Sequence, residues 1–354
     1  MRANKYSFCL GLLLSAAFAK AQSVSYDVIS SDPDSYKRTG LHLGLLNFDT
    51  YNGMSIGSIF KLETVIADRI MPWIEVRPSW HDAAAHHVVS GYPTAIGGIK
   101  KQLVTEIGGA FFLTNKDVHK KVKVVLHSSS HSSGYNRQTT TTTYIMVPSI
   151  VKKMFGLRAG LYNNRRVLEI DEDAHPFYRY LSADGLTNVP INNVGITTTG
   201  QPSGEYYKPL PMSNITDIYG GIHYRKVINT VLRVSGYGKR SNTRILDLFA
   251  DVMIAPVVSI SNVVDNSGKE WKIDPQDGAI RRIGWRAGVV AHSTKSIFHE
   301  YSFDFGQKPG PVLGKSALNN GSYVAICIGV KISSGKSIDI KSHKDKKDKQ
   351  GEGK

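Results

Sequence analysis

The chain has 354 residues, a formal net charge of +15 at pH 7 and a mean hydropathy of -0.21. Beyond the N-terminal leader, no apolar stretch reaches the roughly 20 residues that a membrane-spanning helix needs, which excludes a helical membrane protein. A membrane β-barrel stays compatible with this composition, because alternating strands hide half of their residues from a hydropathy average.

Residues 1–21 have the pattern of a secretory signal peptide. The basic residues Arg2 and Lys5 precede the apolar run "CLGLLLSAAF", and "AKA" supplies a small-x-small cleavage site directly before Gln22. Removing this leader would also remove one of the two cysteines and leave Cys327 alone. We therefore expect an exported protein without an intrachain disulfide.

Segments in which apolar and polar residues alternate recur from residue 38 to residue 333, separated by turn residues. Fourteen such segments are predicted as strands, at 38–48, 54–66, 70–79, 98–114, 118–130, 139–151, 154–168, 212–226, 230–238, 243–255, 257–264, 280–293, 297–306 and 321–333. We expect an all-β fold, a transmembrane antiparallel β-barrel of about 14 strands. Strand counts of 12 or 16 are the alternatives, because the connection at 239–242 is brief and the division at Pro256 is weak.

The connections between the predicted strands differ in length on the two sides of the barrel. Those after even-numbered segments are short, such as "NKD" and "VIN", whereas the long ones follow odd-numbered segments, at 80–97, 131–138, 169–211, 265–279 and 307–320. Short turns on one side and long loops on the other are typical of porins. An even strand count places both ends of the barrel on the short-turn side. We therefore expect a periplasmic N-terminal segment at 22–37 and a basic, disordered periplasmic tail at 334–354.

The last predicted strand, "SYVAICIGVKIS", separates its two faces most clearly. One face carries only large aliphatic residues and is expected to contact lipid: Val324, Ile326, Ile328, Val330 and Ile332. The opposite face carries Tyr323, Cys327 and Lys331 and is expected to point inward. This strand should close the barrel by pairing with the first one near 38–48, because a sheet in hydrocarbon can leave no backbone edge unpaired.

Four stretches carry a family resemblance: "AKA" followed by Gln22, the hairpin "IYGGIHYRKVINTVLRVSGYGKRSN", "GWRAGV" and the C-terminal strand. Together they resemble a Gram-negative outer-membrane β-barrel of the type abundant in Bacteroidota. The resemblance covers nearly the whole chain after the leader, and its motifs are architectural. It implies a location in the outer membrane, reached through a cleaved signal peptide. One departure is that the last strand ends near Ile332 without the terminal aromatic residue that many such barrels carry.

The inward face of the predicted strands mixes charges of both signs. The candidates for lining the lumen are Lys121, Lys123, Arg158, Asp217, Arg225, Arg233, Asp247, Asp251, Arg282, Arg286 and Asp304, with Glu63 as a further acidic residue. Facing rows of opposite charge would set a transverse field and select small polar solutes. Alternatively, the same charges pair and fill the interior of a structural barrel.

Three predicted loops contain side chains capable of chemistry. "WHDAAAHH" brings together His81, Asp82, His86 and His87. "HSSSHSSG" holds His127, Ser128 and His131. Neither has the ligand spacing of a defined zinc site, and a catalytic triad is recognised by geometry instead of by neighbourhood. The longest loop, 169–211, starts acidic and continues aromatic. It is a mobile external loop, a constriction folded into the barrel, a glycan-binding surface or, least favoured, a site for a divalent cation.

These features support three functional hypotheses. The first is a porin-like channel or transporter for small polar solutes. The second is a non-conducting structural or accessory barrel that partners with other envelope complexes, and the third is an outer-membrane hydrolase. No catalytic residue, cofactor or metal is assigned. The basic charge of an exported chain favours anionic lipid head groups, polysaccharide or peptidoglycan over nucleic acid. Outer-membrane lipid and other envelope proteins are the expected partners, with no nucleic acid, and the oligomeric state stays open.

Overall fold

The computed structural model describes residues 24–35, 38–82, 102–133, 137–168, 177–182, 188–190, 211–264, 270–294, 297–314 and 320–334. Most of these residues form β-strands, and no α-helix occurs among them. In this part of the chain we find no helix long and apolar enough to cross a membrane. The predicted signal peptide and, apart from Ser334, the predicted basic tail lie outside the described residues.

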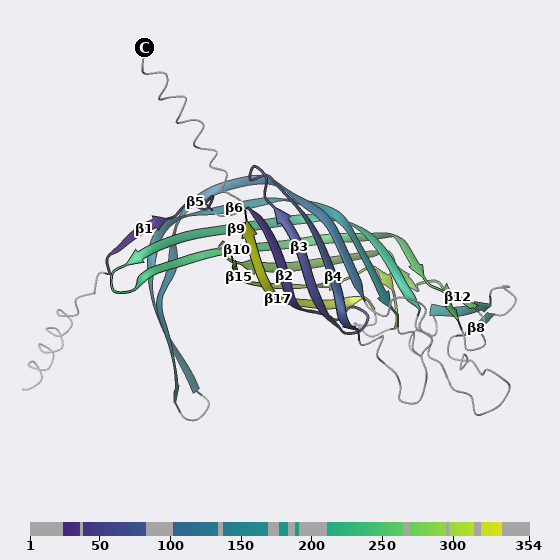
Figure 1. Cartoon of the computed structure of the whole chain (residues 1–354). Helices are drawn as coiled ribbons and strands as arrows, with labels where there is room; N and C mark the ends of the chain where they lie inside the picture. The colour runs from purple at the N-terminus through teal and green to yellow at the C-terminus, as the bar shows by residue number, and fades with distance from the viewer. Residues whose placement is uncertain are drawn as a thin grey trace, which may run out of the picture. The chain divides into compact units, whose positions relative to one another are not determined.

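Ten antiparallel strands close into a barrel (Figure 1). In ring order they are β9 (Met212–Val234), β10 (Gly238–Ile260), β14 (Ile283–His292), β15 (Ile297–Gln307), β17 (Ser322–Ser334), β2 (Thr39–Asp49), β3 (Ser55–Thr64), β4 (Ile70–Asp82), β5 (Leu103–Ser133) and β6 (Arg137–Val167). The ring closes because β6 pairs with β9, from Val151↔Ile228 to Val167↔Met212. The predicted pairing of the last strand with the first is confirmed by the register between β17 and β2.

The expected count of 14 strands is wrong, because four pairs of predicted segments form single strands. Segments 98–114 and 118–130 lie in β5, and segments 139–151 and 154–168 lie in β6. The same fusion of neighbouring segments produces β9 and β10. Backbone groups make the ladder hydrogen bonds, so polar residues that interrupt the side-chain pattern need not end a strand. The register of β6 with β9 accordingly runs through Lys152 and Lys153 without a shift.

The connections still divide into two classes at the two ends of the ring. At the short-turn end the connections are 65–69, 134–136, 235–237 and 293–296. At the long-loop end they are 50–54, 83–102, 168–211, 261–282 and 308–321. The predicted long loop at 131–138 is wrong, because residues 131–133 belong to β5 and residues 137 and 138 belong to β6, while 134–136 lie outside the described residues. The even strand count places the start of β2 and the end of β17 at the short-turn end.

Side chains on the barrel strands alternate between an exposed outer face and a buried inner face. On β17 the outer residues Val324, Ile326, Ile328 and Ile332 are 37–46% exposed, and Val330 is half-buried. The inner residues Tyr323, Cys327 and Lys331 are at most 4% exposed. The structure thus places the aliphatic row of this strand on the outside of the ring.

A second compact unit contains β1 (Tyr26–Ser30), residues 121–148 and residues 230–242. β1 adds to the edge of β9 with Tyr26 opposite Val234. The apolar core of this unit is formed by Val124, Leu126, Val147, Leu232 and Val234. Part of the expected N-terminal segment 22–37 is therefore a strand.

The long connections build two small sheets. One contains β11 (Val263–Val264), β12 (Glu270–Pro275), β7 (Tyr178–Ser182) and β8 (Asn188–Pro190), and the other pairs β13 (Ile280–Arg281) with β16 (Gly310–Pro311). Tyr178 is buried in an apolar cluster with Trp271 and Leu313, and its hydroxyl donates to the Ala279 carbonyl oxygen at 2.9 Å. Burial raises the pKa of the Tyr178 hydroxyl, which keeps it a donor. The predicted loop 169–211 thus contributes strands, and its acidic start lies outside the described residues.

Two adjacent glycines of β9 test how closely the inner face is packed. A Cβ at Gly221 would lie 2.7 Å from the Asp251 Cα of β10, whereas the nearest atom to a Cβ at Gly220 is the Arg158 carbonyl oxygen, at 4.0 Å. Gly221→Ala should lower the free energy of unfolding by about 1–3 kcal/mol through overpacking, while Gly220→Ala should change it little. Urea unfolding of the protein refolded in lipid vesicles measures both, and equal effects would contradict this account.

Candidate functional site

The buried inner face of the barrel gathers charged side chains from many strands. Seven of the predicted lumen-lining residues are buried there: Arg158, Asp217, Arg225, Asp247, Asp251, Arg286 and Asp304. Each strand turns them inward because its alternate positions carry aliphatic or small residues that occupy the outer face. The barrel interior is therefore the candidate functional site.

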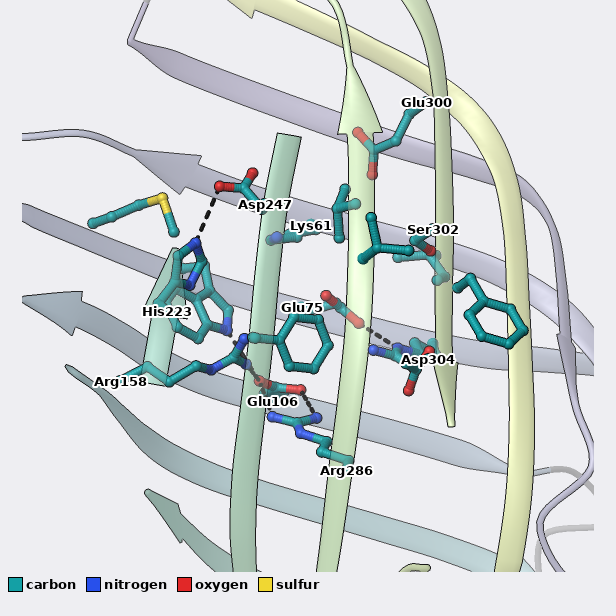
Figure 2. A pocket seen from close by; sticks show the side chains of 18 residues that line it. Lys61, Glu75, Glu106, Arg158, His223, Asp247, Arg286, Glu300, Ser302 and Asp304 are labelled. Atoms are coloured by element: carbon teal, nitrogen blue, oxygen red, sulfur yellow. Dashed lines mark hydrogen bonds and ion pairs between the residues drawn. The ribbon is translucent and has the colours of Figure 1, made fainter. Parts of the chain in front are cut away.

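The carboxylate of Glu106 on β5 is the centre of the first charge network (Figure 2). Arg286 of β14 donates two hydrogen bonds to it, each 2.8 Å long, and Arg158 of β6 donates one at 3.3 Å. The Tyr219 hydroxyl donates at 2.7 Å and the Trp73 indole N–H at 3.2 Å. Bidentate pairing with arginine is among the strongest hydrogen-bonded ion pairs. One carboxylate therefore joins side chains from β4, β6, β9 and β14 to β5.

Asp251 of β10 shares both arginines with Glu106. Arg286 donates its Nε–H to Asp251 at 2.7 Å, and Arg158 Nε lies 3.1 Å from the same carboxylate. The Arg158 guanidinium also lies over the ring of Phe249, 4.2 Å from its centroid. Two carboxylates thus face two guanidinium groups, with aromatic rings on the guanidinium faces. This arrangement compensates charges that would otherwise be costly to bury.

A second network surrounds the carboxylate of Glu63 on β3. Arg225 Nη2 lies 3.2 Å from it, Lys331 Nζ 3.1 Å, Lys61 Nζ 3.2 Å and His42 Nε2 3.3 Å. Arg225 comes from β9 and Lys331 from β17, neither of which is a neighbour of β3 in the ring. These ion pairs therefore cross the interior and do not run along one wall.

Three buried side chains next to this network could in principle hold a metal ion. One ligand atom from each of His42, His292 and Glu300 lies within 4.8 Å of the others. Two imidazoles and a carboxylate suit zinc or iron. However, His42 hydrogen-bonds Glu300, and Lys331 Nζ lies 2.9 Å from His292 Nε2. A lysine ammonium already supplies a cation here, and we assign no metal.

The long-loop end of the interior is closed by residues 308–314, all of which are buried. Lys308 Nζ donates to Asp49 at 2.8 Å and lies 3.9 Å from the centroid of the Tyr323 ring. Burial alone would lower the pKa of Lys308, but the nearby Asp49 carboxylate raises it above its usual value. Lys308 is therefore a charged anchor that fastens the segment to the end of β2.

The same segment passes between opposite walls of the ring. The Tyr51 hydroxyl, just beyond β2, donates to the Pro309 carbonyl oxygen at 2.8 Å. A Cβ at Gly310 would lie 2.6 Å from the Ile215 side chain of β9, which stands across the ring from β2. Gly310 also has a φ of 132°, which glycine adopts readily. Residues 308–314 thus form a plug in the mouth of the barrel.

The two charge networks border a small cavity. A cavity of about 60 Å³ is lined by charged residues that include Lys61, Glu75, Arg158 and Asp304 (Figure 2). This volume holds a few water molecules.

Four predicted lumen-lining residues are exposed instead, which corrects the sequence prediction: Lys121, Lys123, Arg233 and Arg282. Around the first three, aliphatic residues such as Val122 and Leu232 take the buried face. Arg282 lies just before β14 and donates to the Ala255 carbonyl oxygen at 3.2 Å. Their exposure differs from the buried positions of the other seven, because alternation separates two faces without saying which one is enclosed.

The described residues of the two histidine-rich motifs lie on strands, although the sequence predicted loops there. His81 and Asp82 end β4, whereas His127, Ser128 and His131 are residues of β5. The last three are exposed, and the Ser128 hydroxyl lies 3.4 Å from the Thr142 hydroxyl. His86 and His87 lie outside the described residues.

Sequence reasoning missed two central residues, Glu106 and Lys308. A signal for Glu106 exists, because Ile107 and Phe111 in "TEIGGAFF" occupy the outer face and leave Glu106 on the inner one. Lys308 follows the end of β15 and belongs to no periodic pattern. Its role depends on where a connection folds, which alternation does not predict.

Comparisons with known proteins add little to this geometry. No protein-family model matches the chain, and no curated protein matches it. The chain is similar to a solved structure described as the CymD monoaromatic hydrocarbon channel, with 9% identity over 88% of this chain and 95% of that chain and a TM-score of 0.23. It is also similar to OmpT, an outer membrane protein of Vibrio cholerae, with 10% identity over 87% of this chain and 100% of that one and a TM-score of 0.15. Likeness at these TM-scores decides nothing about function.

Arg286 of β14 and Arg282, which lies just before that strand, allow buried and exposed charges to be compared. Arg286→Gln would leave the Glu106 carboxylate without its bidentate partner, and we expect a loss of about 3–5 kcal/mol in the free energy of unfolding. Arg282→Gln removes an exposed charge and should cost about 0.5 kcal/mol or less. Urea titrations of both variants in vesicles measure the difference, and similar losses would show that Arg286 is not essential to the network.

Proposed function

We propose that the protein is a non-conducting outer-membrane β-barrel that serves as a structural or accessory component of the cell envelope. The observation that carries this proposal is the closed interior, where ion pairs join non-neighbouring strands and the plug 308–314 occupies the mouth. No enzymatic activity is part of the proposal. It develops the second of the hypotheses that the sequence left open.

The outer face of the ring supports residence in a membrane. Large apolar side chains are exposed on all ten barrel strands, and examples are Leu41, Phe60, Ile74, Ile107, Leu157, Ile218, Val252, Trp285, Phe303 and Ile326. Soluble monomers rarely expose contiguous apolar patches beyond a few hundred Å². A closed barrel also pairs every backbone group within its wall, as hydrocarbon requires. Lipid is therefore the environment that suits this surface.

The inner face argues against an open pore. A porin-like channel needs a water-filled path, whereas here the charges around Glu106 and Glu63 pair at or near hydrogen-bonding distance. Opening a path would require Lys308 to leave Asp49 and Arg286 to leave Glu106. Separating a buried charge from its partner costs about 3–5 kcal/mol for each pair. The closed state is therefore strongly favoured.

An accessory role is supported by the length of four strands. β5 and β6 contain 31 residues each, and β9 and β10 contain 23 each, whereas a membrane-spanning strand needs about 9–11 residues. The additional residues build the second compact unit together with β1. We infer that this unit offers surface to other envelope proteins, and co-purification of a stable partner would support that inference.

Planar-bilayer recording tests the closed interior. Protein whose migration on gels shifts on heating, and which is therefore folded, should produce no stepwise currents, because ion-paired side chains and residues 308–314 occupy the interior. A porin recorded under the same conditions provides the positive control. Reproducible unitary currents from the folded protein would overturn the non-conducting proposal and restore the channel hypothesis.

A charge on the outer face tests membrane residence. Ile328 is 46% exposed near the middle of β17, and Ile328→Lys should destabilise the inserted barrel by about 2–4 kcal/mol if the site lies near the midplane. Ile328→Leu keeps the apolar surface and should insert normally. Membrane fractionation combined with heat-modifiable gel migration measures insertion. Normal insertion of the lysine variant would contradict a lipid-facing position.

A further inference from the structure

Three cations from adjacent strands meet on the outer face near the short-turn end. Lys153 of β6 is directly opposite Lys226 of β9 in the register of the two strands. Both residues alternate with buried inner neighbours, Met154 and Arg225, so their side chains point outward. Arg244 of β10 is exposed, and its charge repels that of Lys226. Lys120 of β5 adds to the same repulsion.

These outer cations differ from the inner ones in having no acidic partner. No carboxylate among the described residues forms an ion pair with Lys153, Lys226 or Arg244. By contrast, Lys152, the inward neighbour of Lys153, lies 3.1 Å from Asp68. Like charges placed directly opposite each other across two strands are destabilising. The pair therefore favours binding of an anion from outside the chain.

The same two strands become apolar in the direction of the barrel centre. Phe155 stands opposite Tyr224, and Leu157 stands opposite Ile222. In membrane barrels, aromatic residues lie at the level of the lipid headgroups and aliphatic residues lie at the level of the acyl chains. The two pairs follow this order. The outer face is therefore graded from charged to aromatic to aliphatic along β6 and β9.

An open groove of about 480 Å³ continues this gradient. Its floor is shallow where Ala159 pairs with Gly220 and where Gly109 of β5 lies beside them, while Phe111 and Leu157 form its sides. The groove is hollowed because the small residues Gly109, Ala159 and Gly220 stand where the surrounding wall carries large ones. It offers contacts on both sides of a chain that lies in it.

The distance between the cations and the groove matches the thickness of one membrane leaflet. From Lys153 to Ala159 is six residues, or about 20 Å along a strand. With a strand tilt of about 45° this becomes about 14 Å of depth, close to half of the roughly 30 Å hydrocarbon core. The cations would then lie at the headgroup level and the groove would approach the midplane.

We propose that this face binds one anionic phospholipid, with its phosphate against Lys153, Lys226 and Arg244 and an acyl chain in the groove beside Ala159 and Gly220. The inference rests on the membrane residence argued under the proposed function. It requires both parts of the site, since the cations recognise a phosphate and the groove recognises a chain.

Native mass spectrometry of the folded protein in detergent tests the site. When phosphatidylglycerol and phosphatidylcholine are supplied in equal amounts, the wild type should retain more of the anionic phosphatidylglycerol than of phosphatidylcholine. Lys153→Gln/Lys226→Gln should reduce that retention by at least about tenfold. Lys116→Gln/Lys239→Gln removes the same charge from exposed positions outside the cluster and should retain lipid like the wild type.

Two further experiments test whether the bound molecule is held by its acyl chain as well as by its phosphate. Gly220→Val fills the groove and should weaken retention of the anionic lipid, whereas glycerol phosphate without acyl chains should not bind. Heat-modifiable migration is recorded for every variant. Folded, inserted protein without preference for the anionic lipid would overturn the lipid site and leave the proposed function intact. Protein that never inserts would overturn both.

Discussion

The ion pairs around the Glu106 carboxylate are the interaction on which the closed barrel depends. A ring of ten strands is wider than one of eight, in which ordinary side chains just fill the interior. Arginine and the large aromatic residues are long enough to reach across this wider space. Arg158 and Arg286 therefore meet Glu106 and Asp251 between the walls, and Tyr219 satisfies a further carboxylate lone pair. The interior is filled by paired charge instead of by aliphatic packing.

This way of filling the interior links the fold to the proposed function. A buried ion pair adds little stability compared with well-packed apolar groups, but loss of one partner is strongly destabilising. A shift of register would separate Glu63 from Arg225 and Lys331, so the network favours one closure of the sheet. The plug at 308–314 follows the same principle, because Lys308 is held by Asp49. A barrel built in this way would hold its shape and exclude solutes, as the proposed function requires.

Charged side chains on the outer face cannot be neutralised in this way, since no opposite wall of the barrel supplies them with acidic partners. Lys152 and Lys153 are adjacent in sequence, yet only the inward one reaches an acidic side chain. On the outside, neutralisation must come from the surroundings, which in a membrane are lipid headgroups and their counterions. The same strand thus carries a structural cation on one face and a lipid-directed cation on the other.

The sequence by itself determined the all-β class and the pairing of β17 with β2. It also determined that β17 carries an outer row of aliphatic residues and that residues such as Asp247 and Arg286 point inward, because side chains along a strand alternate with a strict period of two. It overestimated the strand count, since backbone pairing continues through polar residues such as Lys152 and Lys153. Only the tertiary structure decided which opposite charges meet and that residues 308–314 close the mouth. Those outcomes depend on contacts between residues far apart in the chain, such as Lys308 and Asp49, and no local pattern records them.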